Sequence, residues 1–557
     1  MNVTKLTDEQ KIILNECDKN LYISASPGSG KSTILSHIAE KIAVDKNSSI
    51  CLISFTNKAA KSIIDKCKDI NNDQITGGTF HGLAYRSMIK NGLNFHICDA
   101  YKQEVIIKKL FECKKDKNKL ERVYEHIASL KSQWPLNTDD EIISTYQNEL
   151  AKYNLLDFDD IIFKFIELIP TLLLPKITHL LVDELQDTSG PQLEMLKVLQ
   201  KKYNSRVIGV ADDDQLLYRW RNARPENIQD FIKTFDCKTL NMGFNFRSAR
   251  IIVEKSSNLI KNNTQRIQKI IRAAKTEEGH VSRYECNHHL EEITYAIGKC
   301  MQNRDKKIAI LYRNRVYKNH LELELRKNKL QYVVNDMFEL TDRSAVKSIM
   351  SIMKIATWNF DIYDLEQATK ALKGIGAATL LKIETESKTR PLMEVINEWL
   401  EDKKKRKKFE TIINIKAFFD ANQEKSLNHL VTYVETQLID SFDFQEDMKS
   451  FIIDITKDYK ITSNSIRDLY NELGLDSKEK EQDKNANIEL STVHGYKGLQ
   501  SEVIIIPWAQ QFSPKTPDEL EDERRCFYVA ITRAESKLYI SYSGEKPLFV
   551  KEMFNEI

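Results

Sequence analysis

A glycine-rich segment near the N-terminus has the residue types of a phosphate-binding loop. Apolar residues Leu21 to Ile23 lead into Ser-Pro-Gly-Ser-Gly, then Lys31 and Ser32 open an apolar periodic segment. A strand, a tight loop and a helix N-terminus direct backbone N–H groups at an anion. The Lys31 ammonium would reach the β- and γ-phosphates of a nucleotide, and the Ser32 hydroxyl would bind Mg²⁺. The expected phosphate-binding residues are Ala25, Ser26, Pro27, Gly28, Ser29, Gly30, Lys31, Ser32 and Thr33.

This loop is a variant, because Ala25 stands where the generic pattern has glycine. The alternative is a chance Gly-Ser turn. The strand before the loop and the helix after it argue against chance.

A second apolar run ends in two acidic residues. His179 to Val182 leads directly into Asp183 and Glu184. In a nucleotide site Asp183 would hold Mg²⁺, mostly through water, and Glu184 would orient and deprotonate the attacking water. An acidic loop without a role is the alternative, and the phosphate loop upstream favours the catalytic pair.

A third apolar run, Val207 to Val210, precedes three aspartates, Gln215 and a stretch of aromatic and arginine residues. The Gln215 amide suits sensing of a γ-phosphate. Tyr218 and Trp220 suit stacking on bases, worth about 1–3 kcal/mol per base. Trp220 could instead be a core aromatic, but the flanking arginines, Arg221 among them, argue against full burial.

Composition narrows the class of protein. At about 150 residues per domain, 557 residues predict three or four units. No apolar run approaches the roughly 20 residues of a membrane span, and the polar N-terminus is no signal peptide. Nine cysteines without a CxxC pair indicate reduced thiols and a cytoplasmic protein. Cys286, His288 and His289 lack a second ligand pair, so no metal site is expected there. A net charge of +2 means that nucleic acid would need a local groove.

Strand-like runs alternate with helical segments, which predicts an α/β fold with parallel sheets and ligands at the carboxyl ends of the strands. Residues 86–150, rich in Lys, Glu and Asn, and residues from about 345 to 475 are predicted to be helical. Within the second region, Gly374-Ile375-Gly376 could hold a duplex phosphate. The basic run 403–408 could contact DNA or be a solvated helix face. Residues 476–485 are predicted to be a polar linker.

Eight segments occur in an order that resembles the UvrD/Rep/PcrA-type superfamily 1 helicases. They are ASPGSGKS, SFTNKAA, GTFHGLA, VDELQDT, ADDDQLLYRWRNA, FNFRS, STVHGYKGL and ERRCFYVAITRA. The resemblance runs from Gln10 to Ala534. It implies an ATP-driven translocase on single-stranded DNA, usually moving 3′ to 5′, with two RecA-like domains that each carry a helical insertion. The expected parts are a first RecA-like domain (1–85 and 151–240) with an insertion (86–150), and a second (241–345 and 481–557) with an insertion (346–480) that could contact duplex.

The resemblance also implies roles for single residues. Gln10 matches the glutamine that reads adenine, and Phe246 stands where the family usually has a Tyr that stacks on adenine. Arg247 and Arg533 match two arginines that reach the γ-phosphate, where a guanidinium stabilises the charge of the transferring phosphoryl group. Exposed salt bridges are the alternative for both. Gln500 replaces a Glu that usually binds the ribose, which leaves the sugar selectivity open.

The implied ligands are ATP, Mg²⁺, single-stranded DNA and a single-strand/duplex junction; no membrane is implied, and a nuclease or a repair or defence protein is a candidate partner. The expected DNA groove consists of Phe55, Asn57, His81, Tyr218, Trp220, Arg221 and His494.

Two other hypotheses stay open. The first is a nucleic-acid-gated regulatory ATPase that signals to a separate nuclease, resembling short UvrD-like subunits of defence systems such as Gabija. The second is a bare P-loop protein. The short stretch after Ala534 leaves little room for a strand-separating hairpin. We therefore expect strong single-strand-stimulated ATPase activity and poor opening of long duplexes by a monomer.

Overall fold

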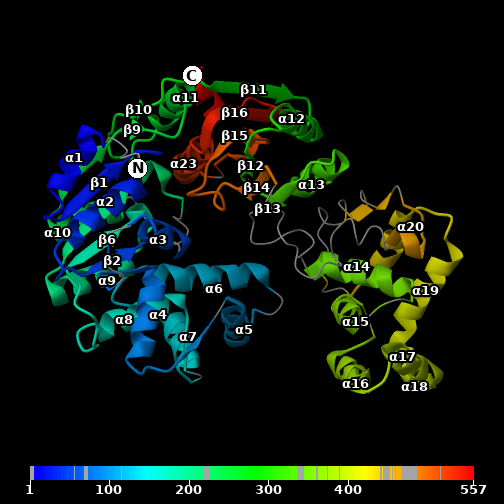
Figure 1. The fold of residues 1–557 in the computed structure, drawn as a ribbon. Helices are drawn as coiled ribbons and strands as arrows, with labels where there is room; N and C mark the ends of the chain where they lie inside the picture. The colour runs from blue at the N-terminus through cyan, green and yellow to red at the C-terminus, as the bar shows by residue number, and fades with distance from the viewer. Residues whose placement is uncertain are drawn as a thin grey trace. The chain divides into compact units, whose positions relative to one another are not determined.

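The computed structural model describes most of the chain. The described residues are 6–55, 57–67, 70, 73–98, 100–113, 116–152, 154–217, 226–334, 344–358, 360, 362–372, 374–387, 389–439, 442, 449, 452–453, 456–457, 459–466, 486–514 and 516–556. The chain divides into two compact units, residues 1–285 with 496–557 and residues 286–495. Two six-stranded sheets and their helices make an α/β fold, as predicted (Figure 1).

The first sheet has the strand order β3-β2-β6-β7-β1-β8, and every neighbouring pair is parallel. Its strands are β1 (Leu21–Ala25), β2 (Ile50–Ile53), β3 (Ile75–Gly78), β6 (His179–Val182), β7 (Arg206–Ala211) and β8 (Lys238–Met242). Both faces are covered: Leu21 and Ile23 pack in one core, and Tyr22 packs in the other. Burial on both faces explains the continuous apolar runs in the sequence.

Helices connect these strands. They are α1 (Asp8–Asn15), α2 (Lys31–Ala43), α3 (Asn57–Ile64), α4 (Phe80–Lys90), α8 (Phe158–Leu168), α9 (Gly190–Tyr203) and α10 (Glu226–Phe235). Two 3-10 turns, η1 (Leu185–Asp187) and η2 (Asp213–Gln215), follow β6 and β7 at the carboxyl edge of the sheet. Thr7 and Gln10 form a capping box at the start of α1.

Three helices between α4 and α8 surround a small core of their own. They are α5 (Ala100–Leu110), α6 (Lys117–Leu130) and α7 (Glu141–Lys152), and the parallel strands β4 (His96–Ile97) and β5 (Leu155–Leu156) flank them. Ile107, Ile127, Ile143 and Tyr146 are buried at the centre of this group.

The second sheet has the order β11-β16-β15-β12-β14-β13. Its strands are β11 (His280–Cys286), β12 (Ile308–Tyr312), β13 (Tyr332–Val334), β14 (Ile488–Thr492), β15 (Ser501–Ile506) and β16 (Ala534–Ser543). Besides β15 and β16, the first unit holds α11 (Arg250–Ile260), α23 (Leu520–Ile531), α24 (Leu548–Met553), the short turns η6 (Ala509–Gln511) and η7 (Pro517–Glu519), and the paired strands β9 (Phe244–Asn245) and β10 (Arg272–Ala273).

The second unit contains α12 (His289–Gln302), α13 (Lys318–Lys327) and the strands β12, β13 and β14. The elements described between β13 and β14 are helical, as the sequence predicts. Its further helices are α14 (Ser344–Ala356), α15 (Ile362–Thr369), α16 (Ala377–Ser387), α17 (Leu392–Glu401), α18 (Lys403–Arg406), η5 (Lys407–Phe409), α19 (Glu410–Ala421) and α20 (Leu427–Glu435). They share an apolar core that includes Ile352, Trp399 and Leu430. The predicted linker 476–485 lies outside the described residues. Among the helices described, none is long and apolar enough to cross a membrane.

Candidate active site

The predicted phosphate loop lies between β1 and α2. Gly28 and Gly30 have φ angles of 68° and 86°, which glycine adopts without strain. Gly30 is the N-cap of α2 and provides no side-chain cap, so the first turn from Lys31 can direct its N–H groups at an anion. Ser26 anchors the loop, because its hydroxyl donates to the carbonyl oxygen of Met242 at 2.6 Å.

The loop packs closely against the segment that carries Arg247. The N–H of Phe246 donates to the Gly28 carbonyl at 2.9 Å, and a Cβ atom on Gly28 would lie 2.6 Å from the Arg247 Cβ atom. A side chain at position 28 would therefore push these segments apart. Asn245 shapes the turn, because its Oδ1 accepts from the N–H groups of Arg247 and Ser248 at 2.8 Å each.

The two residues predicted to contact adenine lie differently around this loop. Gln10 is buried, and its Nε2 donates to the Ser29 carbonyl at 3.4 Å. Phe246 is 45% exposed and is attached to the loop through its backbone. An exposed ring beside such a loop could stack on a base. The contact of Phe246 with adenine stays a prediction.

Asp183 and Glu184 follow β6 at the carboxyl edge of the sheet. The Lys31 Nζ lies 3.4 Å from the Glu184 Oε1. Glu184 has a φ of 51°, a conformation that costs a residue other than glycine about 1–3 kcal/mol and is concentrated at functional sites. Gln186 donates through its Nε2 to the Glu184 Oε2, and Ser54 donates to the Asp183 Oδ2 at 3.2 Å.

The two carboxyl groups have different protonation behaviour. Burial, and then the Glu184 charge, raises the pKa of Asp183 to about 7. Burial alone would raise the pKa of Glu184, but Lys31 and Lys497 lower it to about 2. Glu184 is therefore ionised at neutral pH and can accept a proton from water.

One oxygen of Asp183 fits a cation ligand. The Asp183 Oδ1 is buried and has no hydrogen-bond partner among the described residues. Buried oxygens of this kind need a partner, and a divalent cation would supply one. Ser32, whose hydroxyl the sequence predicts to bind the same cation, lies in the first turn of α2.

Gln215 and Arg533 meet at the same edge of the sheet. The Arg533 Nη2 donates to the Gln215 Oε1 at 2.8 Å, and its Nε donates to the Val529 carbonyl at 3.1 Å. Arg533 is 1% exposed, so the alternative of an exposed salt bridge is wrong for this residue. Burial, together with the neighbouring Arg247, lowers the pKa of Arg533 to about 9, which leaves it charged at neutral pH.

Asp212 connects Gln215 and Arg533 to Glu184, the candidate general base. Its Oδ2 accepts from the Gln215 Nε2 at 2.6 Å, and its backbone N–H donates to the Gln186 Oε1 at 3.1 Å. Because Gln186 in turn donates to Glu184, hydrogen bonds connect Arg533 to Glu184 through three intermediate residues.

Arg247 contacts the residue that replaces the family's glutamate. Its Nε donates to the Gln500 Oε1 at 2.7 Å, and its Nη1 donates to the Thr532 carbonyl at 3.0 Å. Gln500 is a neutral amide, so it positions Arg247 without neutralising its charge. The predicted contact between Gln500 and a ribose remains a prediction.

Lys497, from the HGYKGL segment, contacts η1 and η2, the turns that follow β6 and β7. Its Nζ binds the Asp187 Oδ2 in η1 and the Gln215 carbonyl in η2, the latter at 3.0 Å. Burial raises the pKa of Asp187 to about 6 even though Lys497 lies beside it. The ammonium thus holds the Glu184 and Gln215 turns together.

Three consecutive aspartates, Asp212 to Asp214, form a cluster of carboxylates within 4.8 Å of one another. Two protein cations contact this cluster. Lys269 binds Asp212 and lies 2.8 Å from the Asp213 Oδ1 and 3.1 Å from the Asp214 Oδ2. Arg266 donates to both oxygens of Asp214, at 2.9 and 2.6 Å. These side chains balance most of the acidic charge, so the cluster is an internal ion-pair network.

Two of the predicted DNA residues lie at neighbouring strand ends. Phe55 follows β2, and His81 lies in the first turn of α4, just after β3. The ring of Phe158 contacts His81 edge-on, with the ring centroids 5.9 Å apart. Phe158 is 52% exposed at the start of α8, and the sequence analysis did not select it.

The structure does not test whether the other predicted DNA residues join this group. His494 follows β14 in the second unit and is half-buried. The side chain of Asn57 lies outside the described residues, as do Tyr218, Trp220 and Arg221.

Several contact residues had only weak sequence signals. Gln186 and Lys497 lie inside the segments VDELQDT and HGYKGL, so their motifs were visible although their partners were not. Lys269 carries no local signal, because its partner Asp212 is 57 positions away.

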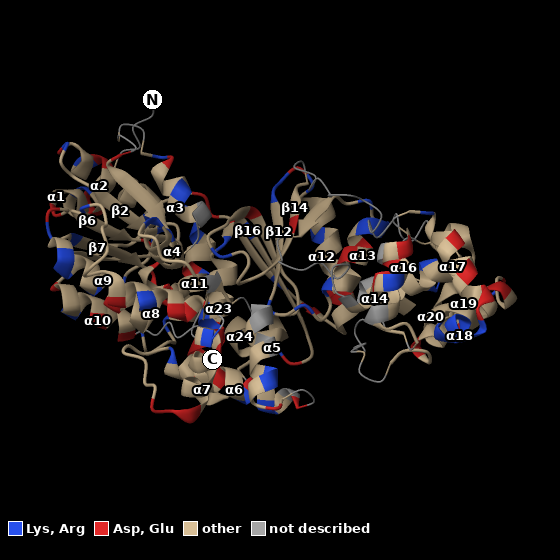
Figure 2. Cartoon of the chain, turned by 90° about the horizontal axis from the view of Figure 1, so that it is seen from below, with Lys and Arg blue, Asp and Glu red and all other residues tan. Residues whose placement is uncertain are grey.

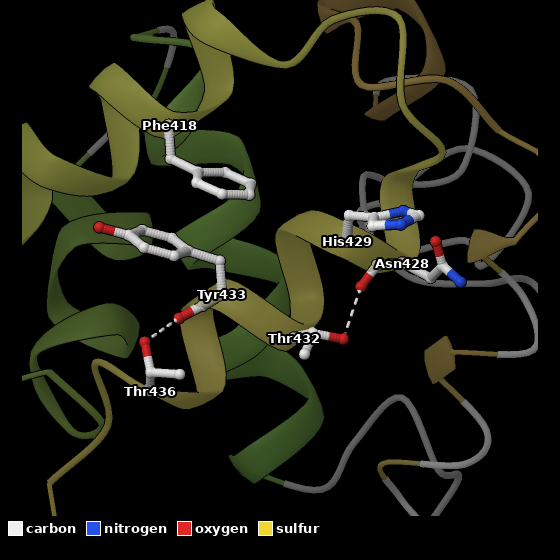
Figure 3. Close-up of a pocket in the computed structure, with 6 residues that line it drawn as sticks. All are labelled: Phe418, Asn428, His429, Thr432, Tyr433 and Thr436. Carbon is white, nitrogen blue, oxygen red and sulfur yellow. Dashed lines mark hydrogen bonds between the residues drawn. The ribbon is translucent and has the colours of Figure 1, made fainter.

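The second unit contains a hollow of about 370 Å³ between α19 and α20 (Figure 3). Phe418 and Tyr433 stack at its wall, with centroids 4.1 Å apart and ring planes 5° apart. Its other lining residues are Asn428, His429, Thr432 and Thr436. None of its six lining residues is a lysine or an arginine, so the hollow lacks the strong cationic groups of a phosphate site.

Comparisons with known proteins agree with this geometry. Residues 6–236 match the UvrD/REP helicase N-terminal domain, and residues 240–545 match the UvrD-like helicase C-terminal domain. The chain is 27% identical to the ATP-dependent DNA helicase PcrA of Staphylococcus aureus (strain Mu50 / ATCC 700699) over 99% of this chain and 85% of that protein. The PcrA protein of Staphylococcus epidermidis (strain ATCC 12228 / FDA PCI 1200) is also 27% identical, with the same coverage. Because the two family matches together span nearly the whole sequence, the chain belongs to the UvrD-like helicase family.

Proposed function

We propose that this protein is an ATP-driven motor that moves 3′ to 5′ along single-stranded DNA and opens duplex at a single-strand/duplex junction. The observation that carries the proposal is the hydrogen-bonded path from Arg533 through Gln215, Asp212 and Gln186 to Glu184. It links a buried arginine to the base candidate that lies beside Lys31 of the phosphate loop.

Hydrolysis would use the groups around the phosphate loop in separate roles. The N–H groups of the loop and Lys31 bind the phosphates, and Glu184 accepts the proton of the attacking water. Arg247 and Arg533 direct positive charge toward the γ-phosphate, with Gln215 as its sensor. Ser32 and Asp183 would hold Mg²⁺, which neutralises phosphate charge when bound.

Coupling to DNA would begin at the carboxyl ends of β2 and β3. Phe55 and His81 follow these strands, and Phe158 extends the same surface with a half-exposed ring. Aromatic rings at such an edge suit stacking on successive bases of a single strand. Trp220 and Tyr218 complete this set in our proposal, on the basis of the sequence.

Within the proposal, residues 1–85 with 151–240 and residues 241–345 with 481–557 serve as the two RecA-like domains, and residues 86–150 and 346–480 serve as insertions. The second insertion is the candidate for duplex contact. Its helix α18 consists of lysine and arginine residues (Figure 2). The turn η5, which follows α18, lies close to Gly374, because a Cβ on Gly374 would come 2.5 Å from the Lys408 carbonyl. Lysines beside an exposed glycine turn suit duplex phosphates.

The test is ATPase activity of the full chain titrated with single-stranded DNA, blunt duplex and duplexes with 3′ or 5′ tails, with and without Mg²⁺. A motor predicts stimulation by single strands, loss of turnover on Mg²⁺ removal, and opening only of the 3′-tailed duplex. Stimulation without opening of even a short tailed duplex would favour the regulatory ATPase that signals to a nuclease. An ATPase rate that DNA does not change would favour a nucleotide-binding protein that does not act on DNA. Raising the salt should weaken DNA binding, because phosphate contacts release counterions.

A further inference from the structure

Lys269 lies far in sequence from the nucleotide-site motifs and reaches them through Asp212. Its side chain is 2% exposed and binds the Asp212 Oδ1. The second oxygen of Asp212 accepts from the Gln215 Nε2 at 2.6 Å. Asp212 itself is fully buried. One carboxylate therefore receives the Lys269 ammonium on one oxygen and the sensor amide on the other.

This contact determines which way the Gln215 amide faces. A carboxylate can only accept hydrogen bonds, so the NH₂ group of Gln215 must point toward Asp212. The Oε1 of the same amide then points toward Arg533 and accepts from its Nη2 at 2.8 Å. Turning the amide by half a revolution would set its NH₂ group against the guanidinium, where two donors face each other.

The carboxylate needs a nearby cation to occupy this buried place. A fully buried carboxylate without a compensating cation is costly. The Lys269 ammonium compensates the Asp212 charge within hydrogen-bonding distance, so the carboxylate can stay buried with its other oxygen directed at the Gln215 amide.

The segment that carries Lys269 is fixed at its other end by α23. Glu521 in the first turn of α23 accepts from the Thr264 N–H at 2.6 Å and from the Thr264 hydroxyl at 2.7 Å. Arg525 donates to the Gln265 carbonyl at 2.5 Å. Arg533 follows the C-terminal end of the same helix. The helix thus holds both the residue that orients the sensor and the arginine that the sensor contacts.

We propose that Lys269 is a positioning residue for γ-phosphate sensing, acting through Asp212 on the amide orientation of Gln215. The inference rests on the proposed ATPase function and adds a specific consequence. Loss of the ammonium should weaken the distinction between a nucleotide with a γ-phosphate and one without it. Binding of the shared ADP part should be preserved.

The experiment measures the affinities of the full-length chain for ADP and for a non-hydrolysable ATP analogue, together with kcat and KM for ATP at saturating single-stranded DNA. The preference is the ratio of the affinity for the ATP analogue to the affinity for ADP. Lys269→Met should lower both this preference and kcat by about tenfold or more, which corresponds to the loss of one charge-assisted hydrogen bond. Its ADP affinity should stay within about twofold of the parent. Lys269→Arg, which keeps the charge, should restore most of the preference.

Two neighbouring aspartates provide a matched pair in case Lys269→Met does not fold. Asp213 binds the same ammonium at 2.8 Å, but its other oxygen accepts from the Ile267 N–H at 2.7 Å. Asp212→Asn should reduce the preference for the analogue, because an asparagine can donate to Gln215. Asp213→Asn removes the same charge and should leave the preference close to that of the parent.

Equal losses in Asp212→Asn and Asp213→Asn would overturn the inference, since they would reflect the charge of the cluster alone. The inference would also be overturned if a folded Lys269→Met protein kept the preference of the parent. A loss of ADP binding equal to the loss of analogue binding would overturn it too. A parent chain without ATPase activity would instead contradict the proposed function.

Discussion

Arg533 and Gln215 are 318 positions apart, and the Arg533 Nη2 donates to the Gln215 Oε1 at 2.8 Å. The arginine follows α23, and the glutamine ends the turn η2 after β7. Both side chains are buried, and the contact joins the fifth and the eighth of the family segments. A movement that separates these residues would expose an arginine that water does not now reach.

Replacing Arg533 by Lys should remove most turnover. A lysine has one ammonium and cannot reproduce the separate donors that bind Val529 and Gln215. Single-strand-stimulated kcat should fall by about 10³-fold, the lower end for loss of an arginine finger. Arg524→Lys is the control on the same helix: Arg524 is buried against Glu552 and Asn263, so its loss should lower the melting temperature with little effect on kcat. If the kcat of Arg533→Lys stays close to that of the parent, Arg533 has no direct role in hydrolysis.

Glu184→Gln should stop turnover while nucleotide still binds. The amide keeps the shape of the carboxylate beside Gln186 but cannot accept a proton from water. We expect kcat to fall by about 10²–10⁴-fold, the usual contribution of a general base. Steady-state hydrolysis and equilibrium binding of an ATP analogue measure the two effects. Turnover close to that of the parent would show that another group removes the proton.

Lys31→Ala should lose phosphate binding as well as turnover. Lys31 lies at the start of α2 and 3.4 Å from the Glu184 Oε1, so its removal takes one positive charge from the phosphate site. The analogue should bind at least about tenfold more weakly, as expected for one charge-assisted contact. Circular dichroism should match the parent, because this side chain is not part of a core. Lys41→Ala, further along the same helix and bound to the Leu14 carbonyl, is the control.

Phe158→Ala should weaken binding of single-stranded DNA. Loss of one stacked base costs about 1–3 kcal/mol. The slope of affinity against salt should not change, because the phenyl ring contacts no phosphate. Leu173→Ala is the control, since Leu173 is 88% exposed and is not among the predicted DNA residues. Fluorescence anisotropy with a labelled oligonucleotide, at several salt concentrations, measures both quantities. A changed slope with unchanged affinity would contradict stacking.

Lys131→Met should make stability fall more steeply with rising pH than it does in the parent. Lys131 is 1% exposed and donates to the Asp157 Oδ2 at 2.6 Å and to the Asp160 Oδ1 at 2.7 Å. Burial raises the pKa of Asp160 to about 7, whereas the pKa of Asp157 is lowered, against the effect of burial, chiefly by the Lys131 charge. Breaking such a buried pair costs about 3–5 kcal/mol.

The sign of the pH effect follows from the loss of the cation. Without Lys131 both folded-state carboxyl pKa values lie above those of the unfolded chain, so the two groups favour folding at low pH and lose that effect as pH rises. The melting temperature of Lys131→Met relative to the parent should therefore fall further between pH 5 and pH 8. Lys152→Met removes an exposed partner of Glu149 and should show no such trend. If the difference in melting temperature between the variant and the parent stays constant from pH 5 to pH 8, the destabilisation comes from lost packing and not from the lost charge.

Much of the site follows from local sequence. A continuous apolar strand followed by Gly-Ser-Gly-Lys-Ser can form a phosphate loop only in a narrow set of backbone geometries. The positive φ angles of Gly28 and Gly30 are consistent with such a loop. The acidic pair after β6 was identified in the same way, because parallel strands place their carboxyl ends at one edge. The predicted adenine contacts of Gln10 and Phe246 remain predictions, since they depend on a bound base.

The sequence by itself determined the α/β class and the family, and it predicted the phosphate loop and the strand-end acids, because each depends on residue types at short spacing. Tertiary structure alone decided the partners of those residues: Gln500 contacts Arg247, and Lys269 compensates Asp212. These pairs join segments separated by 253 and 57 positions. Local spacing carries no information about such contacts, since only the packing of strands and helices brings the side chains within reach.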